Sequence, residues 1–202
     1  MPRSDLEKPL RRLRLEVLWL HEEFVEHSKA PSLRASQLMA EMSVIRLCDS
    51  WARFCRDMIV ISAYGRTTTL DGTILGANLH ANLTNKNQVI PHLLSLYKKR
   101  TYEPNWHRAS ECINAGELLR IQNLANVSAA LGANNSPAEE IRHVRNFYAH
   151  RNKDTWAKAQ STGCFTNVNP TVFDLNQYIE GSITVIDSWK QRLLAIAESA
   201  LL

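Results

Sequence analysis

Apolar residues recur along most of the chain at the three- and four-residue steps of an amphipathic helix. The first run follows the capping pair Ser4 and Glu7 and predicts a helix that continues to about Lys29. A second run, from 32 to about 64, covers more than one face of its helix. Apolar residues on more than one face indicate a helix at the buried centre of the fold.

Residues 65–87 keep no regular period, because three glycines interrupt a stretch of threonines and asparagines. This segment predicts a long irregular loop with room for one short turn of helix. Helical spacing returns over 89–99 and 106–131, and Asp174 is the expected cap of a final helix. No alternating strand pattern and no internal repeat is visible. The pattern predicts an all-α bundle of about five main helices in one domain, residues 1–202.

Composition agrees with a folded, reduced protein. The 202 residues are 45% hydrophobic and 22% charged, a balance that buries a core in a single domain. The net charge of +4 permits an anionic partner without requiring one. The four cysteines form no C-x-x-C pair and the chain begins without a secretory signal, so we expect a cytoplasmic setting. No run approaches the roughly 20 apolar residues of a membrane span.

The strongest chemical pattern lies in Glu139–Trp156, which we expect to form one helix beginning after Ser136. This stretch contains Arg145, Asn146 and His150. A permanent cation, an amide and a group that titrates near neutrality, all within two turns, are suited to handling a phosphodiester.

Helical spacing divides these residues between two directions. Arg142, Asn146 and His150 are four residues apart and share one stripe, which Lys153 follows. Arg145 points about 140° away from His150 on an ideal helix. The two groups therefore converge only if the helix bends or a second copy supplies one of them. A homodimer about a two-fold axis would bring both pairs into a shared cleft.

Positive charge is concentrated in the same stretch. Residues 141–158 contain five Lys or Arg and one acid, Asp154, with Phe147 and Tyr148 among them. Such a cluster suits a phosphate backbone and a stacked base, although a solvated face with ion pairs is the ordinary alternative for a charged helix. The expected RNA-binding residues are Arg142, Tyr148, Arg151 and Lys153.

The segment Arg145-Asn146-Phe147-Tyr148-Ala149-His150 resembles the R-N-x-x-x-H signature of the HEPN superfamily (higher eukaryotes and prokaryotes nucleotide-binding domains). Residues 49–56, around Trp51, are similar to the Trp-containing helix of HEPN proteins associated with ribosome-degrading and phage-defence systems. An acid often follows that Trp, whereas this chain has Ala52. A branch with R-x-x-x-x-H-x-Y is disfavoured, because Asn152 occupies the place of its Tyr.

The resemblance implies a HEPN-like fold and a metal-independent endoribonuclease that acts as a homodimer without a cofactor, often as a toxin or antiviral effector. His150 would assist proton transfer at the ribose 2′-hydroxyl or the leaving 5′-oxygen, and Arg145 would stabilise charge on the phosphorane. Asn146 would orient His150 or the phosphate. The expected products carry a 2′,3′-cyclic phosphate and a 5′-hydroxyl, and an antitoxin or other protein is a possible partner. The alternative is a non-catalytic HEPN module that binds RNA, a nucleotide or a partner protein.

Two other patterns are expected to be structural. His21 and His27 flank an acidic run, but their six-residue separation does not match the H-E-x-x-H zinc spacing, so we expect a solvated acidic face. Cys48 and Cys55 share one face of the second helix and are expected in the core.

Overall fold

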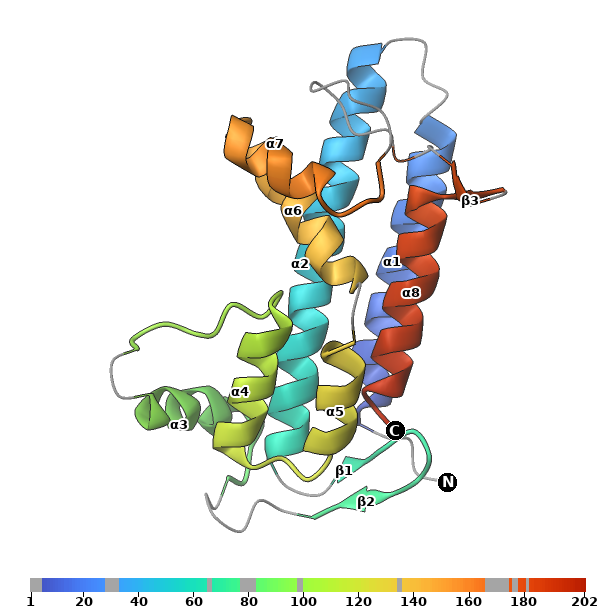
Figure 1. Cartoon of the computed structure of the whole chain (residues 1–202). Helices are drawn as coiled ribbons and strands as arrows, with labels where there is room; N and C mark the ends of the chain where they lie inside the picture. The colour runs from blue at the N-terminus through green and yellow to red at the C-terminus, as the bar shows by residue number, and fades with distance from the viewer. Residues whose placement is uncertain are drawn as a thin grey trace. The chain divides into compact units, whose positions relative to one another are not determined.

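The structure is a computed structural model that describes residues 5–27, 33–64, 67–76, 83–97, 100–133, 136–165, 175, 178–180 and 182–202. Within these ranges the chain forms eight α-helices, one short 3-10 helix and four short strands (Figure 1). The strands form only two hairpins of two strands each. The all-α class predicted from the sequence is therefore confirmed.

The helices are α1 (Glu7–His27), α2 (Leu33–Ala63), the 3-10 helix η1 (Lys86–Gln88), α3 (Val89–Leu96), α4 (Ala109–Leu119), α5 (Leu124–Leu131), α6 (Pro137–His150), α7 (Lys153–Gln160) and α8 (Val185–Ser199). The strands are β1 (Thr67–Thr68), β2 (Ile74–Leu75), β3 (Tyr178–Glu180) and β4 (Ile183–Thr184). The first two helices match the sequence prediction closely. The total exceeds the five main helices expected, partly because each of two predicted helices is divided in two.

Both divisions occur at an arginine with left-handed backbone. Arg120 (φ 52°) separates α4 from α5, and Arg151 (φ 44°) separates α6 from α7. Such a residue is the usual end of a helix, but glycine or asparagine normally occupies it. The prediction of one helix over 106–131 and of one helix over 139–156 is therefore wrong. The breaks were missed because neither has the glycine that usually marks the end of a helix.

Two hairpins occupy places where no strand was expected. In the predicted loop, β1 pairs with β2 in antiparallel register, and Gly72 at φ 90° makes the turn between them. Residues 77–82 of that loop lie outside the described residues. Near the C-terminus, β3 pairs with β4, and α8 begins at Val185. The predicted helix start at Asp174 lies outside the described residues.

The chain divides into two compact units. Unit 1 comprises Met1–Leu13, Trp51–Asn134 and Ala195–Leu202, and unit 2 comprises Arg14–Ser50 and Asn135–Leu194. The boundaries fall inside α1, α2 and α8, so each of these helices contributes residues to both units. The single domain expected from the sequence stays a prediction.

Unit 1 contains a carboxylate that joins α2 to the segment before α4. Glu103 accepts two hydrogen bonds from the Arg56 guanidinium, at 2.6 and 3.0 Å, and one from the Trp106 indole nitrogen at 2.9 Å. The hydrogen bond with Arg56 holds the pKa of Glu103 below its usual value. Fully buried apolar side chains make the core beside it, among them Phe54, Met58, Ile59, Leu93 and Leu119.

Unit 2 is built around a buried glutamate. Glu140 of α6 accepts a hydrogen bond from the Trp189 indole at 2.7 Å and two from the Arg192 guanidinium at 2.5 and 3.2 Å. Its side chain is only 9% exposed, so the carboxylate depends on these donors. It ties α6 to α8 inside an apolar core that includes Val17, Leu20, Val44, Leu47, Ile141, Val144 and Leu193.

Replacing Glu140 should destabilise the protein strongly. Glu140→Ala removes the acceptor and leaves the Trp189 N–H and the Arg192 charge without it, so we expect a loss of about 2 to 3 kcal/mol in the free energy of unfolding. Urea denaturation followed by circular dichroism measures this. The neighbouring Glu139→Ala, whose side chain is 40% exposed, is the control and should cost less than about 1 kcal/mol. Equal losses in both variants would contradict the role assigned to Glu140.

Candidate functional site

The helix that carries the R-N-x-x-x-H segment starts and ends at defined residues. α6 begins at Pro137, as predicted, after the extended backbone of Ser136. The Ser136 side chain makes no capping hydrogen bond, and Glu139 accepts hydrogen bonds from Arg142 instead of closing a capping box. The helix ends at His150, so the predicted catalytic histidine is its last residue.

The three predicted catalytic residues are only partly brought together. The Arg145 guanidinium donates to the Asn146 side-chain oxygen at 3.4 Å, and both residues are half-buried. His150 is exposed, and its side chain makes no hydrogen bond or ion pair with the residues that the structure describes. One chain therefore presents an arginine–amide pair and, at the helix end, a separate imidazole that is open to solvent.

The residue after His150 is fixed by a contact from a distant helix. Arg151 donates its backbone N–H to the Phe147 carbonyl at 2.7 Å, which closes the last turn of α6. Its guanidinium forms an ion pair with Glu41 of α2. Glu41 was not anticipated, because 110 residues separate the partners and nothing local marks the contact. The pair attaches the C-terminal end of α6 to α2 within unit 2.

Lys153 is not on the helix that carries His150. Asn152 starts the new helix α7: its side-chain oxygen accepts the Thr155 N–H at 2.9 Å, and the Thr155 hydroxyl lies 3.3 Å from the Asn152 N–H. Lys153 is exposed in the first turn of α7, which takes a different direction from α6 (Figure 1). The Asn-x-x-Thr spacing is a capping signal that could have located this break.

Besides Arg151, which is paired with Glu41, two more of the predicted RNA-binding residues are engaged by protein. The Arg142 side chain is 14% exposed and bonds to Glu139 at 2.9 Å, so a carboxylate already balances its charge. The ring of Tyr148 is buried and lies 5.9 Å from Phe147. The structure does not support base stacking on Tyr148, because its ring belongs to the apolar face of α6. Arg151 and Lys153 are exposed.

Charged side chains of α6 act on a buried thiol of α2 at this site. Burial and the nearby Asp49 raise the pKa of the Cys48 thiol to about 11, although the charges of Arg145 and Arg142 oppose the shift. Cys48 of α2 therefore lies close enough to α6 to feel the charges of these two arginines. Burial and the charge of Arg142 lower the pKa of His143, which keeps that imidazole neutral at pH 7. Cys48 is buried, as the sequence predicted, and all four cysteines are free.

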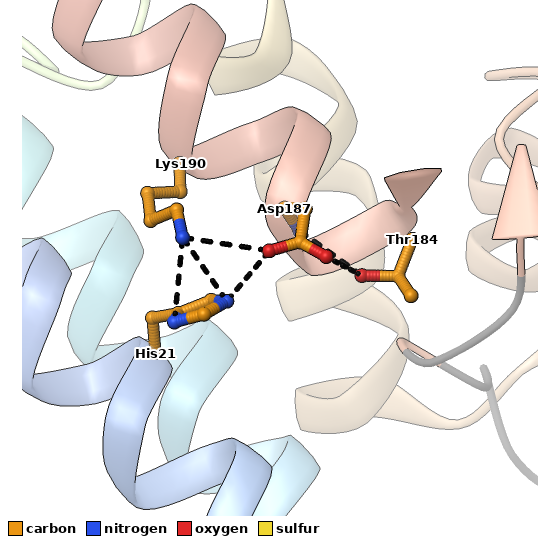
Figure 2. Close-up of polar contacts among 4 residues, drawn as sticks. All are labelled: His21, Thr184, Asp187 and Lys190. Carbon is orange, nitrogen blue, oxygen red and sulfur yellow. Dashed lines mark hydrogen bonds and ion pairs between the residues drawn. The ribbon is translucent and has the colours of Figure 1, made fainter. Parts of the chain in front are cut away.

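A second polar cluster lies between α1 and α8 (Figure 2). His21 Nε2 is 2.7 Å from Asp187 Oδ1, and the Thr184 hydroxyl donates to the other carboxylate oxygen at 2.7 Å. Lys190 Nζ approaches His21 Nε2 to 3.3 Å and Asp187 to 3.4 Å. The His21 side chain is only 18% exposed, so the solvated face expected around it is wrong at that residue. The partner lies 166 residues away, beyond the reach of a local pattern.

The Asp187 cluster is best explained as a helix cap with a tie to α1. Thr184 and Asp187 have the spacing of a capping pair at the start of α8, and the Asp187 N–H donates to Thr184 Oγ1 at 3.3 Å. Burial acts to raise the pKa of Asp187, but hydrogen bonds from Thr184 and His21 outweigh it and hold that pKa below its usual value. Within the described ranges, no group of three or more His, Cys, Asp or Glu is arranged to hold a metal ion.

Comparisons with known proteins give no relative. No family model matches the chain, and no curated protein and no solved structure matches it either. Across the described helices, none is both long enough and apolar enough to cross a bilayer.

The Asp187 cap should make the stability of the folded protein fall at acidic pH. A carboxyl whose pKa is lowered by folding stabilises the folded state above its ordinary pKa of 3.8, and this contribution is lost as the pH falls below that value. The melting temperature of Asp187→Asn should therefore lie below that of wild type near about pH 6, and the difference should shrink toward about pH 3.

Thr184→Val is the companion variant, because it keeps the carboxylate and removes one hydrogen bond to it. Its melting temperature should fall less than that of Asp187→Asn, with the same acid dependence. A difference between wild type and Asp187→Asn that stays constant from about pH 3 to about pH 7 would contradict the assignment.

Proposed function

We propose that the chain is a metal-independent endoribonuclease of the HEPN type, acting as a toxin or antiviral effector. The observation that carries the proposal is the position of the R-N-x-x-x-H segment at the C-terminal end of α6. There His150 is exposed as the last helical residue, and Arg145 and Asn146 are in contact just over one turn before it. A terminal, exposed imidazole is accessible to a polymer as large as RNA.

Each of the three side chains has a role that suits its placement. His150 transfers a proton at the attacking 2′-hydroxyl or the leaving 5′-oxygen, since an imidazole can both accept and donate a proton. Arg145 stabilises the negative charge that develops on the phosphorane, and Asn146, which accepts from Arg145, keeps that guanidinium in place. Attack by the 2′-hydroxyl leaves a 2′,3′-cyclic phosphate and a 5′-hydroxyl.

The exposed cations around His150 suit a phosphate backbone. Arg151 directly follows the histidine, Lys153 and Lys158 lie on the next helix, α7, and all three are exposed. Contacts of this kind position RNA without reading its sequence. Arg142 and Arg151 contribute less than the two lysines, because Glu139 and Glu41 balance their charges.

The site is proposed to form between two chains. Arg145 and His150 make no polar contact with each other, and the helical spacing aims them in directions about 140° apart. A second copy related by a two-fold axis supplies the missing group to each half of the site. This explains how one α6 can carry both residues without pairing them.

A binding module without catalysis is the second candidate. Two of the four predicted RNA-binding residues are cations held by carboxylates, Arg142 by Glu139 and Arg151 by Glu41. Such pairing lowers the local positive charge. It favours a site at which an anionic ligand replaces the carboxylates Glu139 and Glu41 as the partner of the arginines. The partner is then RNA, a nucleotide or an acidic protein segment.

RNA cleavage by the purified protein tests the proposal. We expect cleavage of a labelled RNA that persists in excess EDTA and falls at least about 100-fold in His150→Ala and in Arg145→Ala. Mapping of the product ends should find 2′,3′-cyclic phosphate. His92→Ala, which changes a histidine on α3 of unit 1, is the control and should cleave as wild type does.

Two outcomes would decide against this mechanism. Cleavage that EDTA abolishes would rule out metal-independent chemistry, and cleavage that survives His150→Ala would remove the assigned base. Tight RNA binding without cleavage, across several RNAs, would favour the binding module.

A further inference from the structure

Helix α2 carries a stripe of exposed apolar residues that points away from the core of unit 2. Leu38, Met42 and Ile45 follow one another at steps of four and three, and they are 57%, 41% and 37% exposed. This is the spacing of the contact seam of a two-helix coiled coil, so the three side chains lie along one side of the helix. The core of unit 2 takes a different side of α2, with Val44 and Leu47.

A charged residue continues the stripe at each end. Arg34 lies four residues before Leu38, Asp49 lies four residues after Ile45, and both are exposed. Neither forms an ion pair with the part of the chain that the structure describes. Arg34 lies in the first turn of α2, where the helix dipole disfavours a cation. The stability of the helix itself therefore does not account for that charge.

Both flanks of the stripe are already paired within the chain. On one side, Glu41 forms its ion pair with Arg151. On the other, Arg46 bonds to Glu16 at 3.0 Å and lies 4.5 Å from the centre of the Trp19 ring. The stripe between these flanks is apolar in its middle and charged, with opposite signs, at its two ends.

We infer that a second copy of this chain docks on the stripe, with the two α2 helices antiparallel about a two-fold axis near Met42. In this arrangement Leu38 faces Ile45 of the second copy, and Arg34 faces its Asp49. Symmetry makes every contact twice. From Arg34 to Asp49 the seam is about 22 Å long, or roughly four helical turns.

The charge pattern selects this occupant and this orientation. A parallel pair would place Arg34 against Arg34 and Asp49 against Asp49, whereas an antiparallel pair converts both clashes into ion pairs. Only a partner with the reversed charge order fits, and the same helix turned around has that order. Trp19, which is 40% exposed beside Arg46, adds apolar area to the edge of the contact.

The docking has a consequence for the site, which rests on the proposed function. Glu41 is next to Met42 and therefore close to the axis, and it holds Arg151, the residue after His150. The C-terminal ends of both α6 helices consequently lie on either side of the same axis. The docking itself depends only on the stripe on α2.

The mass of the protein in solution tests the docking. Sedimentation velocity should give wild type twice the 23.0 kDa chain mass, and Leu38→Glu should sediment as a monomer. Leu15→Glu is the matched control, because Leu15 is a leucine of similar exposure, 59%, on α1. Circular dichroism should show unchanged helix content in both variants. A monomeric wild type, or a dimer that Leu15→Glu breaks and Leu38→Glu does not, would overturn the inference.

A charge exchange tests the orientation. Arg34→Glu and Asp49→Arg alone should each weaken the dimer at least about tenfold, because like charges then face each other. The double variant should recover dimerisation, since the ion pairs are restored with reversed sign. Further weakening in the double variant would overturn the antiparallel arrangement.

RNA cleavage by the same samples separates this inference from the proposed function. If the variants change dimerisation as expected but the wild-type dimer cleaves no RNA, the proposed ribonuclease function is contradicted and the proposed docking stands. A monomeric Leu38→Glu that cleaves RNA at the wild-type rate overturns the link between the stripe and the site.

Discussion

The arrangement of the polar residues in unit 2 depends on the left-handed backbone at Arg151. A non-glycine residue in this conformation costs on the order of 1 kcal/mol. Here the Arg151 N–H closes the last turn of α6 on Phe147, the guanidinium pairs with Glu41, and Asn152 caps α7. Together these contacts offset the cost. Without the break, α6 would continue to Trp156 and His150 would be an ordinary mid-helix residue.

Apolar periodicity predicts the long helices well, because their core faces repeat over many turns. It locates α1 and α2 to within a few residues, whereas the correct start of α6 comes from the Ser136–Pro137 signal. The same pattern runs unchanged through Arg120 and Arg151, since apolar residues on both sides keep helical spacing. The break at Arg151 depends on a capping pair and a contact with α2, and the second of these is not local. The hairpin of β1 and β2 was missed because its strands have two residues each, too short to show alternation.

Only the part of the candidate site that depends on neighbouring residues in the sequence could be predicted. The R-N-x-x-x-H spacing is local, and it identifies Arg145, Asn146 and His150 as a group. Whether a residue near them faces solvent is decided by the fold: Tyr148 fits both a basic surface and an apolar stripe, and packing assigns it to the stripe. Glu41 and Asp187 were missed because their partners are 110 and 166 residues away. No spacing rule reaches that far.

The four buried cysteines give each unit its own chemical reporter. Cys55 and Cys112 belong to unit 1, and Cys48 and Cys164 belong to unit 2. Burial raises the pKa of Cys55 above its ordinary value and that of Cys164 to about 12, so these thiols remain protonated and unreactive in the folded protein. Alkylation therefore requires local opening. Peptide-resolved mass spectrometry of the alkylated chain would follow the opening of the two units separately, with no substitution in the sequence.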